Sequence, residues 1–230
     1  MGDFFDKVKG GLIVSCQALE DEPLYGSDVM AKMAAAAEQG GASGIRANGA
    51  EDIRAIKALT SLPVIGLIKR NYLDSEVYIT PTKAEIDELI SADADIIALD
   101  ATNRLRPKGE TLEELVKYIK AKGQKMMADV STLEEGVYAE ELGFDCISTT
   151  LSGYTSYSPQ SDSPDFELLK NLLEKVTIPV IAEGRIGTPD QAKEALSMRS
   201  FAVVVGSAIT RPQLITRQFA DKLKETTIIK

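Results

Sequence analysis

The chain has 230 residues, of which 44% are hydrophobic and 27% charged, and it carries a net charge of −9. This composition is typical of a globular domain. The negative charge argues against nucleic acid as a partner, although local basic groups can still hold a small anionic ligand. No apolar run approaches the roughly 20 residues of a membrane helix, and the first residues lack an apolar signal region. We therefore expect a cytoplasmic protein without a membrane partner.

The chain contains no histidine, which limits the catalytic groups and metal sites that it can form. This absence excludes a Ser-His-Asp triad, a Cys-His pair and any His-ligated metal. Cys16 and Cys146 are the only cysteines, and in a cytosolic chain we expect both to be reduced thiols. Acid–base work then falls to Lys, Glu, Asp, Tyr or Cys, and a catalytic metal would need carboxylates alone.

Eight short apolar segments alternate with helical patterns along the chain, which favours parallel βαβ units. Each segment is nearly continuous in apolar residues, as expected for strands buried on both faces. The predicted strands are Leu12–Cys16, Gly44–Ala47, Val64–Lys69, Asp95–Asp100, Lys125–Val130, Cys146–Thr150, Pro179–Glu183 and Phe201–Gly206. Eight is the number that closes a (β/α)₈ TIM barrel, whose typical length is about 250 residues. We therefore predict one barrel domain over residues 1–230.

Helix starts are marked by local motifs. Capping-box patterns are present at Thr82-x-x-Glu85, Thr111-x-x-Glu114 and Ser131-x-x-Glu134. Ser163-Pro164 and Thr188-Pro189 each place a cap residue before a proline at the first helical position. A short helix over residues 3–8 is expected to close the bottom of the barrel, and residues 226–230 are expected to fray.

Polar residues end the predicted strands, and all these ends lie on the catalytic rim of such a barrel. Lys69 follows an apolar strand, so partial desolvation would lower its pKa and make it a usable base, acid or Schiff-base amine; alternatively it snorkels to the rim as a salt-bridge partner. Glu183 ends the seventh strand, where desolvation would raise its pKa. Lys69 and Glu183 could therefore act together as an acid/base pair. Alternatively, Glu183 only holds Arg185 or Lys69 in place.

Other strand ends offer binding groups. Arg46 and Arg185 could hold oxygens of an anionic or carbonyl-bearing substrate, or form structural ion pairs with Asp129 or Glu183. Asp100 and Asp129 could orient Lys69, bind sugar hydroxyls or only balance charge.

A phosphate site is predicted after the eighth strand. Gly206-Ser207 opens a helical segment whose backbone amides favour phosphate, and Arg211 adds positive charge. The alternative is an ordinary strand-to-helix turn. Cys16 has no histidine to activate it and is expected to be a small wall residue of the pocket, while Cys146 is expected in the core.

Several motifs together resemble the N-acetylmannosamine-6-phosphate 2-epimerase family. They span nearly the whole chain and are Ile13–Leu19 (IVSCQAL), Gly44–Ala47 (GIRA), Ile65–Arg70 (IGLIKR), Ala128–Thr132 (ADVST), Ser148–Thr155 (STTLSGYT) and Val204–Pro212 (VVGSAITRP). One departure is Met198-Arg199-Ser200, where the family usually has a glycine before the eighth strand.

The resemblance implies a metal-free, cofactor-independent barrel of the ribulose-phosphate-binding type. It would interconvert N-acetylmannosamine 6-phosphate and N-acetylglucosamine 6-phosphate in sialic acid catabolism. Lys69 and Glu183 match the family's acid/base residues. The positions that match its substrate contacts are Gln17, Arg46, Asp129 and Arg185.

Two other functions remain open from the residues alone. The first is a Schiff-base sugar-phosphate aldolase that uses Lys69. The second is a non-catalytic sugar-phosphate-binding barrel. The sequence also leaves the oligomeric state open, with a homodimer as one arrangement.

Overall fold

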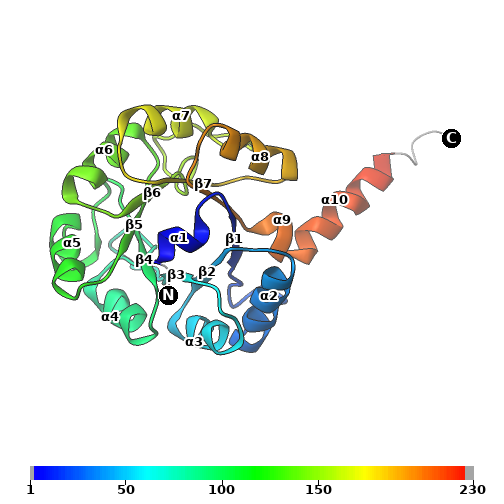
Figure 1. The fold of residues 1–230 in the computed structure, drawn as a ribbon, viewed down its shortest axis with the longest axis horizontal. Helices are drawn as coiled ribbons and strands as arrows, with labels where there is room; N and C mark the ends of the chain where they lie inside the picture. The colour runs from blue at the N-terminus through cyan, green and yellow to red at the C-terminus, as the bar shows by residue number, and fades with distance from the viewer. Residues whose placement is uncertain (1–2, 226–230) are drawn as a thin grey trace.

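The computed structural model describes residues 3–225, and its centre is a closed parallel barrel (Figure 1). Each strand pairs with the next, and β1 pairs with β8 to close the ring. The strands are β1 Leu12–Cys16, β2 Gly44–Asn48, β3 Val64–Leu67, β4 Ile96–Asp100, β5 Met126–Asp129, β6 Cys146–Ser148, β7 Val180–Glu183 and β8 Ala202–Val205. The predicted TIM barrel is confirmed, with most strands slightly shorter than expected.

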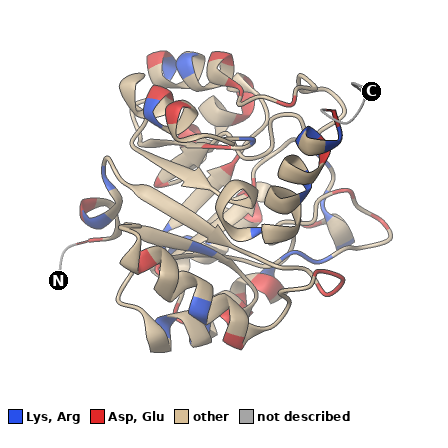
Figure 2. Cartoon of the chain, turned by 90° about the vertical axis from the view of Figure 1, so that its right-hand side faces the viewer, with Lys and Arg blue, Asp and Glu red and all other residues tan. Residues whose placement is uncertain are grey.

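A helix follows almost every strand and covers the outside of the barrel (Figure 1). The α-helices are α1 Phe4–Val8, α2 Ser27–Gln39, α3 Ala50–Leu59, α4 Lys83–Ser91, α5 Leu112–Ala121, α6 Leu133–Leu142, α7 Phe166–Lys175, α8 Pro189–Ser197, α9 Ser207–Thr210 and α10 Pro212–Glu225, with a short 3₁₀ turn, η1, at Pro107–Gly109. Figure 2 shows the charged residues spread over these helices, while the strands are mostly free of them.

Alternation along each strand builds two apolar layers, because successive strand side chains point to opposite faces. Inward residues fill the barrel, among them Ile65, Met127 and Val204. Outward residues such as Val203 and Val205 pack toward the helices. Cys146 lies in the inner layer and is fully buried, as the sequence predicted.

The predicted short helix at the start of the chain is confirmed as α1, which Asp3 caps. Phe4 and Val8 of α1 belong to the inner apolar cluster, so α1 plugs the end of the barrel at which the strands begin. Figure 2 shows α1 at this end, with the strands running away from it. The fraying predicted for residues 226–230 lies outside the described residues.

Three of the five predicted helix caps are confirmed, at Thr82, Thr111 and Thr188. The prediction at Ser131 is wrong by one residue, because Thr132 caps α6 and pairs with Glu135. Glu135 Oε2 also accepts from the Ser131 hydroxyl, so Ser131 supports the cap without forming it.

The predicted cap at Ser163 is wrong by two residues. Asp165 caps α7 by accepting from the backbone N–H of Leu168. Pro164 therefore lies outside the helix rather than at its first position. A carboxylate is at least as good a cap as a serine hydroxyl, so the local pattern did not distinguish the two.

The departure at residues 198–200 has a backbone consequence. Arg199 adopts a φ of 76°, a left-handed conformation that glycine accepts more easily than arginine. The turn precedes β8, at the end of the barrel opposite the strand ends that carry the predicted chemistry.

The last helix, α10, leaves the ring and projects from the barrel (Figure 1). None of its side chains is buried, and Phe219 is 70% exposed. An apolar groove of about 630 Å³ runs along the outer side of β8 and β1; its lining includes Leu12, Leu196, Val203, Val205 and Ile209. Among the described residues, no helix is long and apolar enough to cross a membrane.

Candidate active site

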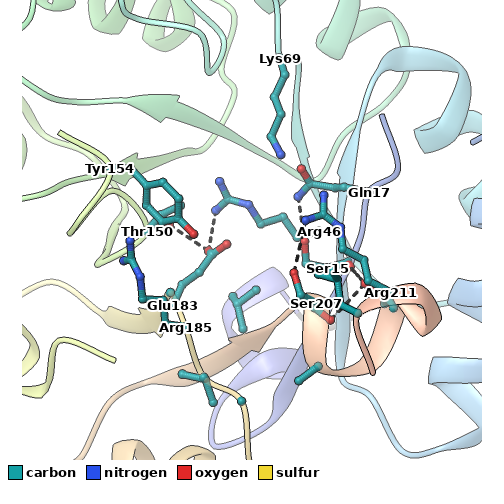
Figure 3. A pocket seen from close by; sticks show the side chains of 18 of the residues that line it. Ser15, Gln17, Arg46, Lys69, Thr150, Tyr154, Glu183, Arg185, Ser207 and Arg211 are labelled. Atoms are coloured by element: carbon teal, nitrogen blue, oxygen red, sulfur yellow. Dashed lines mark hydrogen bonds and ion pairs between the residues drawn. The ribbon is translucent and has the colours of Figure 1, made fainter. Parts of the chain in front are cut away.

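A cavity of about 490 Å³ opens at the carboxyl ends of the strands (Figure 3). Most of the predicted site residues line it: Gln17, Arg46, Lys69, Glu183, Arg185, Gly206, Ser207 and Arg211, whereas Asp129, Asp100 and Cys16 do not. The lining residues come from five different strand ends and the loops behind them, which the closed barrel brings to one rim.

Arg46 is the buried centre of the site, with only 1% of its side chain exposed. Its Nη1 donates to Asp129 Oδ1 at 3.0 Å and to Glu183 Oε2 at 2.8 Å, and Nη2 donates to Asp129 Oδ2 at 2.5 Å. Burial tends to lower the pKa of Arg46, but the two carboxylates outweigh it and raise that pKa. Arg46 therefore forms the ion pairs with both carboxylates that the sequence had offered as one alternative.

Asp129 lies behind Arg46 and is fully buried. It does not line the cavity, so direct contact between Asp129 and the substrate stays a prediction. In the structure, Asp129 holds the guanidinium of Arg46. Asp100, the register partner of Asp129 on β4, does not line the cavity either, and its carboxylate accepts from Thr102 and Arg104.

Glu183 has one engaged carboxylate oxygen and one that is available. Oε2 accepts from Arg46, from the Thr150 hydroxyl at 3.0 Å and from the Ser148 hydroxyl at 3.3 Å. Oε1 accepts no hydrogen bond from residues 3–225, and 13% of the side chain remains exposed. Burial raises the pKa of Glu183, while Arg46 opposes that rise. Glu183 is thus anchored on one side and presented to the cavity on the other.

Lys69 enters the same cavity from the end of β3 (Figure 3). Its backbone N–H donates to Asn48 Oδ1 at 2.7 Å. Within the described part of the chain, its amine forms no ion pair. Burial, together with the positive charges of Arg46 and Arg211, lowers the pKa of Lys69 to about 8. The predicted desolvation is confirmed, and the salt-bridge alternative is not what the structure shows.

Arg185 is fixed by the loop between β6 and α7. Its Nη1 donates to the Ser152 carbonyl at 2.7 Å and its Nη2 to the Gly153 carbonyl at 2.9 Å. The guanidinium lies 4.4 Å from the centre of the Tyr154 ring, and the backbone of Arg185 is left-handed with a φ of 54°. The loop between β6 and α7 therefore shapes the site by holding this arginine.

The predicted phosphate residues lie at the start of α9 and just after it. Gly206 precedes the four-residue helix, which begins at Ser207. Arg211 Nη2 donates to Glu22 Oε2 at 2.9 Å, and its Nε lies 2.9 Å from Glu22 Oε1 in the same ion pair. Nη1 of Arg211 lies 3.4 Å from the Ser207 hydroxyl. Glu22 fixes the guanidinium at the wall of the cavity.

Gln17, the residue after β1, completes this wall. Cys16 does not line the cavity: it is fully buried in the outer apolar layer, so the prediction of a wall residue is wrong, because alternation along β1 turns this side chain toward the helices. Gln17 donates from Nε2 to the Ser15 hydroxyl at 2.9 Å, while its Oε1 is buried without a hydrogen-bond partner in the described residues. Burial raises the pKa of Cys16 to about 12, so its thiol is not ionised at neutral pH. Gln17 Oε1 is an acceptor available to a ligand.

Some site residues were not predicted. Thr150 and Tyr78 line the cavity, as do Leu214 and Gln218 of α10. Thr150 ends a predicted strand and could have been found by that rule. Tyr78 reaches the cavity because of the path of its loop, and α10 reaches it because of the direction of the helix. No sequence motif predicts either of these.

The comparisons with known proteins agree over nearly the whole chain. Residues 30–225 match the NanE family model, described as "Putative N-acetylmannosamine-6-phosphate epimerase". A relative from Clostridium perfringens strain SM101, named "Putative N-acetylmannosamine-6-phosphate 2-epimerase", is 63% identical over 95% of this chain and 99% of its own length. A relative of the same name from Clostridioides difficile strain 630 is 57% identical over 95% and 98%.

Solved structures give the same answer. The N-acetylmannosamine-6-phosphate 2-epimerase from Clostridium perfringens superposes with a TM-score of 0.94 at 61% identity, covering 96% of each chain. A thiamine phosphate pyrophosphorylase from Pyrococcus furiosus has a TM-score of 0.61 at 22% identity, covering 90% of each chain, a likeness of fold alone. The chain belongs to the N-acetylmannosamine-6-phosphate epimerase (NanE) family.

Proposed function

We propose that this chain is a cofactor-independent isomerase that interconverts N-acetylmannosamine 6-phosphate and N-acetylglucosamine 6-phosphate in the cytoplasm, within sialic acid catabolism. One observation carries the proposal. Lys69 from β3 and Glu183 from β7 line a single cavity, and each presents a proton-transferring atom that no ion pair within residues 3–225 occupies. The volume of this cavity, about 490 Å³, lies within the usual range for small-molecule sites.

The reaction inverts one carbon through loss and return of a proton. Opening the sugar ring exposes the C1 aldehyde, which makes the neighbouring C2–H acidic. One group removes this proton and leaves an enediolate. A second group returns a proton to C2 from the opposite face. No electron acceptor is needed, because the substrate and the product are isomers.

The properties of Lys69 and Glu183 fit these two roles. With a pKa of about 8, Lys69 is partly neutral near pH 7 and can accept a proton. The raised pKa of Glu183 makes its protonated form accessible as the partner acid. Which residue acts first depends on which epimer is bound.

The remaining side chains suit binding and charge stabilisation. Arg46 adds positive charge beside the developing oxyanion while it holds Glu183. Arg185 and Gln17 offer donors and an acceptor for the acetamido group, and Asp129 supports this set through Arg46. We assign the phosphate to Gly206, Ser207 and Arg211, where backbone amides and a cation converge.

Proton NMR of N-acetylmannosamine 6-phosphate with the protein in heavy water tests the function. We expect N-acetylglucosamine 6-phosphate to form and the C2 hydrogen to be replaced by deuterium. Cleavage of the sugar, with a borohydride-trapped adduct on Lys69, would support an aldolase instead. Binding without turnover or exchange would support a non-catalytic sugar-phosphate binder.

Substituting Gly153 should weaken substrate binding through Arg185. A Cβ at residue 153 would lie 2.5 Å from Arg185 Nη1 and 2.7 Å from Nη2, and Gly153 has a φ of 75°. Gly153→Ala should therefore displace the guanidinium and lower kcat/KM by about 10- to 100-fold, the loss expected for hydrogen bonds to a charged group. Gly109→Ala, at a similar φ of 70° but with open space around it, is the matched control. An equal loss in both variants would contradict this role of Arg185.

We further propose that the protein is a homodimer in which α10 of one copy packs on the other. In a TIM barrel the helices form a complete outer ring, yet here α10 projects from it (Figure 1). Ile215 and Phe219 lie four residues apart, so they share one face of α10. The apolar groove beside β8 and β1, lined by Leu196, Val203 and Ile209 among others, is where a ring helix would pack. The α10 helix of a second copy of this chain would place its apolar face, with Ile215 and Phe219, in that groove.

Phe219→Glu should shift the protein toward the monomer. Burying a phenylalanine contributes about 1.5–3 kcal/mol, so its loss should raise the dimer dissociation constant by at least tenfold. Light scattering coupled to size exclusion measures the mass, and Arg217→Glu on another face of α10 is the control. A wild-type protein that is monomeric at micromolar concentrations, with α10 folded onto its own barrel, would contradict the dimer.

A further inference from the structure

The hydroxyl of Thr150 lies between two carboxylates. Its Oγ1 is 2.9 Å from Asp129 Oδ1 and 3.0 Å from Glu183 Oε2. A threonine hydroxyl has only one proton to donate. At any moment, therefore, Thr150 donates to one of the two carboxylates and not to both.

Ser148 completes the arrangement. Its Oγ is fully buried, 2.8 Å from Thr150 Oγ1 and 3.3 Å from Glu183 Oε2. Ser148 can thus donate either to Thr150 or to Glu183. The two hydroxyls form a small rotatable network that ends on Glu183 on one side and on Asp129 on the other.

The two carboxylates differ in what else holds them. Asp129 accepts from both Nη atoms of Arg46 in a paired geometry, which is the geometry of an ionised carboxylate with arginine. Glu183 receives only one Nη of Arg46, and only on Oε2. Asp129 is therefore held by Arg46 through both of its oxygens, whereas Glu183 keeps Oε1 without a donor among the described residues.

Accordingly, we propose that Thr150 is a positioning residue whose hydroxyl turns between Glu183 Oε2 and Asp129 Oδ1 as Glu183 loses and gains its proton. This inference rests on the proposed epimerase function, in which Glu183 alternates between base and acid. When Glu183 is ionised, Thr150 donates to Oε2. When Glu183 is protonated, Thr150 donates to Asp129 and loses no hydrogen bond.

The arrangement also decides which oxygen of Glu183 carries the proton. Arg46 donates to Oε2 in both states, and the hydroxyls of Thr150 and Ser148 face the same oxygen. An oxygen that already accepts from these donors is a poor site for a proton, so the proton resides on Oε1. Oε1 is the oxygen that the described residues leave available for C2 of the substrate.

Thr150→Val and Thr150→Ser test this inference. Valine has nearly the same shape as threonine but no hydroxyl, whereas serine keeps the hydroxyl. Thr150→Val should lower kcat by about 10- to 100-fold, as expected for the loss of a hydrogen bond to a charged group, with little change in KM. Thr150→Ser should recover most of kcat.

The pH dependence of kcat distinguishes this role from a purely structural one, because a structural role of Thr150 would not shift the pH profile. The bond from Thr150 favours the ionised form of Glu183 and lowers its pKa. In Thr150→Val, the limb of the kcat profile that reports on Glu183 should therefore move to higher pH in both reaction directions. The limb that reports on Lys69 should stay in place.

Thr60→Val is the matched control. It removes a hydroxyl that donates to the Ile56 carbonyl at the end of α3, before β3 and so at the far end of the barrel. Its kcat and pH profile should equal those of the wild type. Thermal unfolding of all three variants separates loss of chemistry from loss of folding.

Three results would overturn the inference. The first is a Thr150→Val variant with the kcat and pH profile of the wild type. The second is a Thr150→Ser variant as impaired as the valine variant, because the hydroxyl would then not be the cause. The third is a wild-type protein that neither epimerises nor exchanges the C2 hydrogen, which would remove the proposed function itself. Since the first two require an active wild type, the failures are distinguishable.

Discussion

Lys69→Ala should lower kcat by about 10²- to 10⁴-fold, the usual contribution of a positioned acid or base. Exchange of the C2 hydrogen with heavy water should disappear for at least one of the two epimers. Lys69 supplies an amine to the cavity whose pKa, lowered to about 8 mainly by burial, lets it work near neutrality. Proton NMR started separately from each epimer measures both effects.

Lys69→Arg separates proton transfer from charge. Arginine keeps a positive charge at the same strand end but does not lose its proton in the working range of pH. If Lys69 transfers protons, the arginine variant should be about as inactive as the alanine variant. Recovery of activity in Lys69→Arg would mean that the residue acts only as a cation.

The pH dependence follows from the same pKa. In the direction in which Lys69 is the base, it must be neutral, so kcat should rise with pH and level off above about pH 8. In the reverse direction Lys69 must be protonated, so kcat should fall above that pH. Profiles that rise together in both directions would contradict the assignment.

Arg46→Met should destabilise the protein by about 3–5 kcal/mol, as expected when one partner of a buried ion pair is removed. The variant leaves the fully buried Asp129 and the nearly buried Glu183 without their shared cation. For a domain of this size, such a loss lowers Tm by about 6–20 °C. Thermal and urea unfolding measure the change.

The loss should shrink at low pH. Burial already raises the folded-state pKa of Glu183, and without Arg46 to oppose this effect that pKa rises further above its unfolded value. A raised folded-state pKa for an acid means that the penalty is present at neutral pH and is relieved as the pH falls through that pKa. The difference in stability between the wild type and Arg46→Met should therefore narrow as the pH falls below neutral and Glu183 becomes protonated in the folded variant.

Two variants control for this prediction. Arg46→Lys keeps a charge but not the fork that engages both carboxylates, so its stability should be intermediate. Lys32→Met removes an exposed ion pair with Asp28 and should change stability by less than about 1 kcal/mol. An Arg46→Met variant no less stable than Lys32→Met would show that the buried ion pairs contribute little.

Local signals in the sequence predicted most of the fold. The apolar runs marked all eight strands, and Thr82, Thr111 and Thr188 marked three helix starts. Near Ser131 and Ser163 a second residue, one or two positions further along the chain, could also form the cap. Thr132 and Asp165 accept the capping hydrogen bonds from the backbone N–H groups of Glu135 and Leu168. Such choices between nearby residues depend on packing rather than on the motif.

Site residues could be predicted where they lie at the end of a strand. Lys69 and Glu183 were placed by this rule, and both line the cavity. The partners of each residue were not predictable. Thr150, for example, was visible as a polar strand end, but nothing in the chain indicated that its hydroxyl would reach both Asp129 and Glu183.

The sequence by itself determined a closed barrel with Lys69 and Glu183 at the carboxyl ends of its strands. Both follow from local properties, namely the spacing of the apolar segments and the residues at which they end. Only the tertiary structure decided that Arg46 bridges Asp129 and Glu183, residues 83 and 137 positions away in the chain. It also decided that α10 leaves the ring (Figure 1). Contacts of this range exist only after the barrel closes, and the direction of a terminal helix depends on the surface available to it.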